Sequence, residues 1–256
     1  MVPPSVGDAQ PELVCSKLVV CRSQDVLSEI RLLYASVPGE SAVPKFEYSS
    51  FLSYRHGQGQ IKQRFIEEFH RALTGELELL RGEEVFVDRE RVKGGDFYNP
   101  ALGRAVYQSA TLIVIYQPNY FDLLHPYCAR EYRGMRELEK DRLAMLPNVA
   151  ERDHGLIVPV VLRGAESIPA ELSALRQHED FSKFMLMDEE LSKHPQYAPK
   201  IKEIAEYIDA RCRSLEAAEV PFEDARAFQL PDEDSTRRWI QSLNLSRSRF
   251  PGGGRV

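Results

Sequence analysis

Residues 111–116 read Thr-Leu-Ile-Val-Ile-Tyr, a short apolar run in which β-branched side chains dominate. Such a run is typical of a strand buried on both faces, as in parallel sheets covered by helices. We therefore predict a central strand at Thr111–Tyr116 and look along the chain for its neighbours.

Similar short runs occur on either side of this strand, and helical patterns separate them. Further strands are expected at Glu47–Tyr54, Glu84–Asp88, Leu156–Leu162 and Phe184–Met187. Helices are expected where apolar residues recur at helical spacing or helix-start signals occur: at Ile61, Phe65, Phe69 and Leu73, over 99–108, over 127–146, and at Ile201, Ile204, Ala205, Ile208 and Cys212. Alternating strands and helices predict βαβ units on a five-stranded parallel sheet, an α/β fold.

The composition excludes several classes of protein. The 256 residues are 43% hydrophobic and 28% charged, which is ordinary for a globular protein. A net charge of −6 argues against a nucleic-acid coat. The longest apolar runs, Leu112–Tyr116 and Leu156–Leu162, are too short to span a bilayer, and the N-terminus has no signal-peptide pattern. We expect a cytoplasmic protein with no membrane and no nucleic-acid partner. The four cysteines have no metal-ligand spacing, so we expect reduced thiols and no metal site.

Three regions are expected along the chain. Residues 1–44 form an N-terminal extension with one helix near Gln24–Ser36, and residues 45–215 form the main domain. Residues 216–256 contain a linker, a short helix at Ser235–Leu245 that carries Trp239, and a disordered tail. The pattern leaves open whether that helix docks on a partner or covers the sheet.

Ligands of open α/β sheets bind outside the carboxyl ends of the strands. Arg55 follows the first strand, the loop 89–97 follows the second, and Glu131 lies near the start of the helix after the third. We expect these groups to share one rim. It has a cation, an aromatic ring and a carboxylate, and no evident nucleophile–base pair.

Four stretches in order resemble the TIR (Toll/interleukin-1 receptor) domain family, over roughly two thirds of the chain. Phe51-Leu52-Ser53-Tyr54-Arg55 resembles its opening motif. Val85-Phe86-Val87-Asp88, followed by Gly95 and Phe97, resembles its second strand and BB loop. Ser109 to Tyr120 resembles the next helix end and strand, and Tyr127-Cys128-Ala129-Arg130-Glu131 resembles its Trp-Cys-x-x-Glu motif. The resemblance implies a flavodoxin-like five-stranded parallel sheet with helices on both faces.

The resemblance also implies a site. Many TIR domains cleave NAD at the nicotinamide–ribose bond, and their catalytic glutamate matches Glu131. A single carboxylate suffices chemically, because nicotinamide in NAD is already cationic and leaves as a neutral base. Tyr54, Arg55, Phe97 and Tyr127 match positions around the bound dinucleotide, with Arg55 suited to phosphate. NAD is then a substrate, and no cofactor is implied.

Each of these residues also has a structural interpretation. Glu131 is a carboxylate near a helix N-terminus, which the helix dipole favours without any catalysis. Arg55 is otherwise a solvated arginine, Tyr54 a core residue and Phe97 a loop anchor. Tyr127 replaces the family's usual tryptophan, and Lys93 stands where some NAD-cleaving members carry a polar or acidic residue.

Two functions follow from the resemblance. The first is an NAD glycohydrolase giving nicotinamide and ADP-ribose or a cyclic isomer, in bacterial antiphage immunity. It would be activated by oligomerisation through the loop 89–97 and by an upstream sensor. The second is a non-catalytic adaptor that binds other TIR domains. A phospho-acceptor receiver domain is rejected, because Ser-Tyr-Arg and Gln-Pro-Asn stand where its acidic residues belong.

Overall fold

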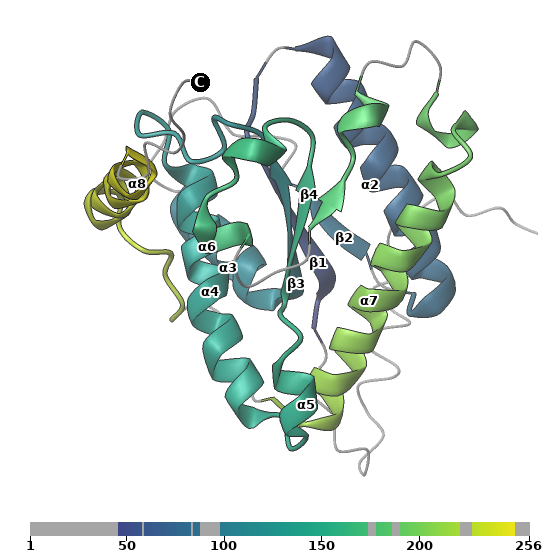
Figure 1. Ribbon diagram of the computed structural model, residues 1–256. Coiled ribbons are helices and arrows are strands. Elements are labelled where there is room, and N and C mark those ends of the chain that lie inside the picture. Colours follow the sequence, from purple (N-terminus) through teal and green to yellow (C-terminus); the bar gives the residue numbers. More distant parts are fainter. Residues whose placement is uncertain are drawn as a thin grey trace, which may run out of the picture. The chain divides into compact units, whose positions relative to one another are not determined.

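Five parallel strands form the sheet at the centre of the computed structural model (Figure 1). The strands are β1 (Tyr48–Tyr54), β2 (Glu84–Val87), β3 (Ser109–Tyr116), β4 (Ile157–Val161) and β5 (Glu179–Asp180). Their order is β2-β1-β3-β4-β5, which is the flavodoxin-like order. The predicted α/β fold with a five-stranded parallel sheet is confirmed.

The structure describes residues 46–57, 59–82, 84–87, 98–173, 178–185, 190–220 and 227–248. The helix expected near Gln24–Ser36, the loop 89–97 with Phe97 and Lys93, and residues 249–256 of the expected C-terminal tail lie outside the described residues. None of the helices in the described part of the chain is long and apolar enough to cross a membrane.

Helices cover both faces of the sheet (Figure 1). Helices α2 (Gln60–Leu80) and α7 (Tyr197–Ala217) contribute to the core on one face, and α3 (Tyr98–Gln108) and α4 (Tyr127–Met145) to the core on the other. All eight residues of β3 are buried, as expected for the central strand. The remaining elements are α5 (Val149–Arg152), α6 (Ala170–Ser173), α8 (Glu233–Ser248) and the 3₁₀ helices η1 (Ala165–Ser167), η2 (Ser182–Phe184) and η3 (Leu191–Lys193).

Alternation along β1 divides its side chains between the two faces, because successive strand residues point to opposite sides. Phe51 packs in the core beneath α3 and α4, and Leu52 packs in the core beneath α2 and α7. Tyr54 packs against the same core as Leu52. The last residues of β1 therefore face two different layers of helices.

The fifth strand was predicted at the wrong place. It lies at Glu179–Asp180, where these residues pair with Val160 and Val161 of β4. Phe184, expected in this strand, belongs to the 3₁₀ helix η2 and is fully buried. Its ring lies 5.1 Å from that of Phe181, so its apolar character serves to anchor a turn in the core.

Ile61 also departs from expectation. It was placed on the buried face of its helix, but it is 51% exposed in the first turn of α2. Phe65, Phe69 and Leu73 on the following turns are buried. The apolar face thus begins one turn after the helix does.

The C-terminal half of α4 is fixed from within the core. Arg142 is 5% exposed and donates to the carbonyl oxygens of Ser109 at 2.7 Å and Tyr107 at 2.5 Å. Burial lowers the pKa of Arg142 to about 10, so the guanidinium stays protonated at neutral pH. One turn earlier, Glu139 accepts a hydrogen bond from the backbone N–H of Leu156 at 2.6 Å. These bonds join α4 to the starts of β3 and β4.

Candidate functional site

A buried carboxylate lies at the carboxyl edge of the sheet. Glu131, in the second turn of α4, is 1% exposed. The hydroxyl of Ser53, on β1, donates to Oε2 of Glu131 at 2.5 Å. Ser53 Oγ also lies 2.6 Å from the hydroxyl of Tyr120, in the loop between β3 and α4. Three segments that are distant in sequence thus meet at one carboxylate.

The donors in this group follow from the chemistry of a hydroxyl. Ser53 has one hydrogen, which it gives to Glu131, so the hydroxyl of Tyr120 must be the donor to Ser53. The bonds then run from Tyr120 through Ser53 to Glu131. Linked hydrogen bonds in a low-dielectric interior strengthen one another, and such a network holds the carboxylate in one orientation.

Arg55 follows β1 directly and turns toward the same loop. Its guanidinium lies 3.0 Å from Oδ2 of Asp122, two residues after Tyr120. Its backbone carbonyl accepts a hydrogen bond from Nζ of Lys62 at 2.7 Å. The buried Nε of Arg55 has no hydrogen-bond partner among the described residues. A guanidinium with an unused donor is suited to an added anionic oxygen.

Lys62 brings a second cation to this edge. It comes from the first turn of α2 and is partly buried. Burial lowers the pKa of Lys62, and the positive charge of Arg55 lowers it further. The two cations repel each other, so an anion placed between them would be favoured electrostatically.

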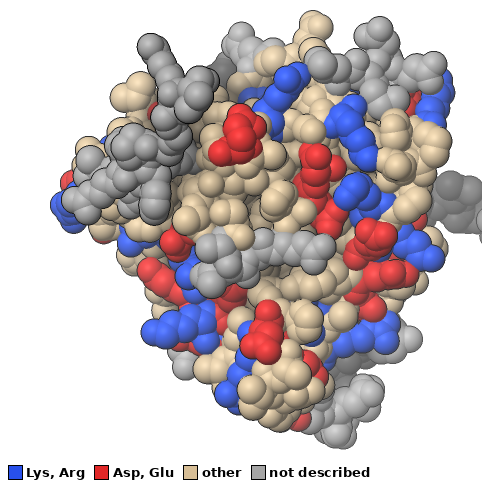
Figure 2. All heavy atoms as spheres, viewed as in Figure 1, with Lys and Arg blue, Asp and Glu red and all other residues tan. Residues whose placement is uncertain are grey.

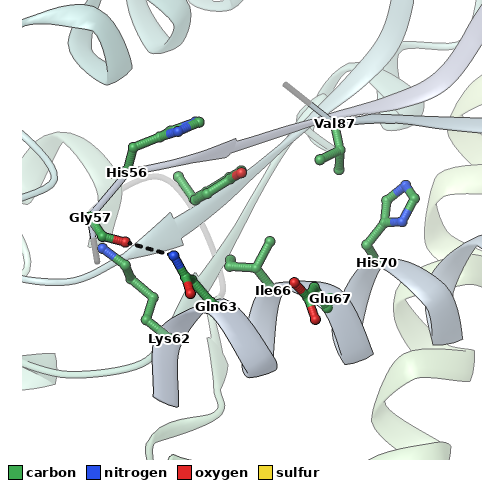
Figure 3. Close-up of a pocket in the computed structure, with 9 residues that line it drawn as sticks. His56, Gly57, Lys62, Gln63, Ile66, Glu67, His70 and Val87 are labelled. Carbon is green, nitrogen blue, oxygen red and sulfur yellow. Dashed lines mark hydrogen bonds between the residues drawn. The ribbon is translucent and has the colours of Figure 1, made fainter. Parts of the chain in front are cut away.

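A pocket of about 340 Å³ opens on the α2 side of β1 (Figure 3). Lys62, Gln63, Ile66 and His70 project from α2 toward the strands. Tyr54, at the end of β1, also lines the pocket. The other lining residues are His56, Gly57, Glu67 and Val87. The volume is within the range of small-molecule sites, which begins at roughly 300 Å³.

An aromatic pair forms part of this pocket. The rings of Tyr54 and His56 are stacked, with centroids 4.5 Å apart and an interplanar angle of 11°. Gln63 donates to the carbonyl oxygen of Gly57 at 3.4 Å, which joins the loop after β1 to α2. The pocket therefore offers a flat aromatic surface next to the cation of Lys62.

The sequence-predicted residues are divided between two sides of β1. Glu131 and Tyr127 belong to α4, and Arg55 reaches the loop that precedes that helix. Tyr54 lies on the opposite face of the sheet, in the pocket beside α2. Tyr127 is partly buried in the first turn of α4. Phe97 is outside the described residues.

The sequence alone did not identify four residues of the candidate site. The sequence assigns no role to Ser53 and Tyr120, although both lie in the TIR-like motifs, and it does not mark Lys62 or Asp122. Alternation along β1 places Ser53 on the same face as Phe51, which points it toward α4. No local pattern marks Lys62, because its place depends on how α2 packs.

Among the described residues, no cluster of three or more His, Cys, Asp or Glu side chains is suited to hold a metal ion. On the face shown in Figure 2, lysines and arginines are interspersed with aspartates and glutamates.

Comparisons with known proteins give a limited result. No protein-family model and no curated protein sequence matches this chain. Among solved structures, the chain is similar to the TIR domains in the structure of the activated Roq1 resistosome directly recognizing the pathogen effector XopQ. The identity is 18%, the match covers 76% of this chain and 98% of that chain, and the TM-score is 0.30. At that score the likeness carries no argument about function, and the fold rests on the strand order.

Proposed function

We propose that this protein is an NAD glycohydrolase of the TIR type that acts through the carboxylate of Glu131. The observation that carries the proposal is the fixed orientation of that carboxylate at the carboxyl edge of the sheet, where Ser53 donates to it at 2.5 Å. This edge is where open α/β sheets bind their ligands.

The reaction requires only one carboxylate. The bond between ribose C1′ and the nicotinamide nitrogen breaks, and its electron pair leaves with the nitrogen, which becomes neutral. Water supplies the oxygen that bonds to C1′, and one proton is released. Glu131 stabilises the positive charge that develops on the ribose ring; a well-placed electrostatic group is worth on the order of 3 kcal/mol. If a ring nitrogen or hydroxyl of the same nucleotide replaces water, the product is a cyclic isomer.

The neighbouring groups suit the rest of the dinucleotide. Arg55, with its unused Nε donor, is assigned to the pyrophosphate, and Lys62 lies next to it. Tyr54 and His56 provide a stacked aromatic surface for a base. Tyr127 and Phe97 complete the proposed binding set, as the TIR resemblance implies.

Burial of Glu131 sets a condition on this activity. At 1% exposure the carboxylate is out of reach of NAD until neighbouring groups move. This supports a proposal in which self-association, through the loop 89–97 and under control of an upstream sensor in bacterial immunity, opens the site. Activity would then rise more steeply than protein concentration.

The same burial favours a second function. A glutamate that is 1% exposed and bonded to Ser53 also serves as a structural link between α4 and β1. In that case the protein is a non-catalytic module that binds other TIR domains. The two proposals share the fold and differ in whether Glu131 ever meets NAD.

The test is nicotinamide release from NAD by the full chain at several protein concentrations, beside Glu131→Gln. Glutamine retains an oxygen that accepts from Ser53, so the variant keeps the fold and loses the charge. Release by the wild type alone supports the enzyme, and chromatography of the co-product distinguishes hydrolysis from cyclisation. Self-association without cleavage at any concentration supports the adaptor.

A further inference from the structure

A segment near the end of the described residues packs on α3 and on α4, the helix that carries Glu131. Residues 227–243, which we name the C-terminal strap, consist of an extended stretch followed by most of α8. In Figure 1, α8 lies beside α4, and the stretch before it runs along α4. The strap packs on α3 and α4, on the same side of the sheet as Glu131.

The extended stretch is seated over two glycines. Leu230 is 6% exposed. A Cβ on Gly134 of α4 would come within 2.8 Å of Leu230 Cδ2, and one on Gly103 of α3 within 3.4 Å of the carbonyl oxygen of Phe228. The missing side chains therefore create the space that the strap occupies. The ring of Phe228 lies 5.4 Å from that of Tyr107, which extends the contact along α3.

Helix α8 adds an aromatic contact. The ring of Trp239 lies 5.9 Å from Tyr132 of α4 at an interplanar angle of 28°, and 5.1 Å from Phe121 in an edge-on arrangement. One residue further, Ile240 is fully buried. Ring pairs of this kind stabilise a contact beyond the effect of the area that they bury.

Hydrogen bonds join the strap to the first two turns of α4. Arg130 is 6% exposed, and its Nε donates to the carbonyl oxygen of Pro231 at 2.7 Å. Arg133 donates to the hydroxyls of Ser235 at 3.0 Å and Thr236 at 2.9 Å. Burial lowers the pKa of Arg130, and Glu233 of the strap counteracts that effect.

Glu131 lies between two residues that the strap holds. Arg130 before it bonds to Pro231, and Tyr132 after it stacks on Trp239. The far half of α4 has its own anchors in Arg142 and Glu139, which belong to the main core. The N-terminal half of α4 thus depends on the strap in a way that the C-terminal half does not.

We propose that the C-terminal strap is a positioning element for Glu131, which holds the first two turns of α4 so that the carboxylate meets Ser53. Leu230 and Trp239 are its positioning residues, and they touch neither NAD nor the reacting atoms. Release of the strap then loosens residues 127–134 selectively. The expected effect of the strap on catalysis rests on the proposed function. Its expected effect on the local stability of residues 127–134 does not.

The test compares amide hydrogen exchange in five versions of the whole 256-residue chain: wild type, Leu230→Ala, Trp239→Ala, Leu215→Ala and Trp239→Phe. Leu215 is fully buried on the opposite face of the sheet, so its variant makes the same chemical change away from the strap. Exchange is measured for residues 127–134 and 138–145 at equal distance below each melting temperature. Trp239→Phe, which keeps a ring, serves as the conservative variant.

Both strap variants are expected to raise exchange at 127–134 by about tenfold relative to 138–145, because local opening of a segment depends on its own contacts. Leu215→Ala should not raise the exchange of one segment more than that of the other. Trp239→Phe should keep most of the protection that Trp239→Ala loses. Nicotinamide release should show a fall in kcat with KM little changed.

A rise in exchange that is uniform along α4 in the strap variants would overturn the inference. So would a selective rise at residues 127–134 in Leu215→Ala as large as in the strap variants. If the wild type releases no nicotinamide while the strap variants still loosen 127–134, the proposed function fails and the mechanical role of the strap stands. If NAD is cleaved and residues 127–134 keep their protection in both strap variants, the proposed function stands and the positioning role of the strap fails.

Discussion

The hydroxyl of Ser53 lies 2.5 Å from Oε2 of Glu131, although 78 positions separate the two residues in the chain. The bond joins the end of β1 to the second turn of α4. It makes the orientation of the carboxylate a property of the packed sheet, because a helix on its own leaves a glutamate side chain free to rotate.

Removal of the Ser53 hydroxyl should destabilise the protein. Ser53→Ala deprives a buried carboxylate of a donor, which costs about 1–3 kcal/mol. Ser50→Ala on the same strand is the matched control: its buried Oγ has no hydrogen-bond partner among the described residues. Denaturant unfolding should show a lower midpoint for the first variant and little change for the second. Equal midpoints would show that the Ser53 bond contributes nothing.

Arg55, which forms an ion pair with Asp122, should matter more for binding than for stability. Both side chains are partly exposed, at 18% and 24%, and such pairs contribute about 0.2–1 kcal/mol. If Arg55 holds the pyrophosphate, Arg55→Ala raises the KM for NAD, and Asp122→Asn leaves it unchanged or lowers it, because the guanidinium is released. Steady-state kinetics with melting temperatures check this. A KM raised equally by both variants would contradict a direct role for Arg55.

Two glycines in helices should respond differently to alanine. Gly75 in α2 has open space where its Cβ would lie, so Gly75→Ala should stabilise the protein by about 0.5–1 kcal/mol. Gly134→Ala has the same gain in helix propensity, but Leu230 must move by a few tenths of an ångström or more to admit the methyl group. Its net gain should be smaller or negative, whereas in a Leu230→Ala background Gly134→Ala should show the full gain. Denaturant unfolding of Gly75→Ala, Gly134→Ala, Leu230→Ala and the Gly134→Ala/Leu230→Ala double variant measures the difference, and equal gains at both glycines in the wild-type background would disprove it.

Acid should weaken the start of α8. Asp232 accepts from the backbone N–H of Ser235 at 2.9 Å, and this bond, with that of the Ser235 hydroxyl, lowers the pKa of Asp232. The pKa of Asp232 is lower in the folded protein than in the unfolded chain. Its hydrogen bonds with Ser235 therefore stabilise the folded protein at pH values above the unfolded pKa, about 3.9, and this stabilisation is lost as the pH falls through the folded pKa.

The fluorescence of Trp239, the single tryptophan of the chain, reports this change. Emission should shift as the pH falls below about 4 in the wild type. In Asp232→Asn, which keeps a capping oxygen without a titrating group, the shift should be smaller. Identical titrations of both proteins would assign the acid effect to other carboxylates.

Substitution of Arg142 should be among the most destabilising changes in the core. Arg142→Met fills similar space but leaves the carbonyl oxygens of Ser109 and Tyr107 without their charged donor, at a cost of about 3 kcal/mol. Arg136→Met, at a side chain that is 31% exposed and whose ion pairs are 3.7 Å or longer, should cost less than about 1 kcal/mol. Comparison of the two midpoints in guanidinium checks the contrast. A small loss at Arg142 would mean that water replaces its hydrogen bonds.

The parts of the fold that depend on local periodicity were predictable. The run Thr111–Tyr116 predicted a central strand, and β3 is buried along its whole length. Helical spacing predicted α2 and α7. The fifth strand was misplaced because Phe184 is apolar for another reason, as an anchor of a turn against Phe181. A two-residue strand such as Glu179–Asp180 has too few residues to show alternation.

The sequence by itself determined the α/β class, the strands at its centre and the placement of Arg55 and Glu131 at one edge, because strand and helix periods are written in neighbouring residues. Only the tertiary structure decided that Ser53 meets Glu131, that Tyr54 faces the other side of the sheet, and that Trp239 stacks on Tyr132. These relationships join distant segments, and their free energy comes from burial and packing that exist only once the layers have assembled.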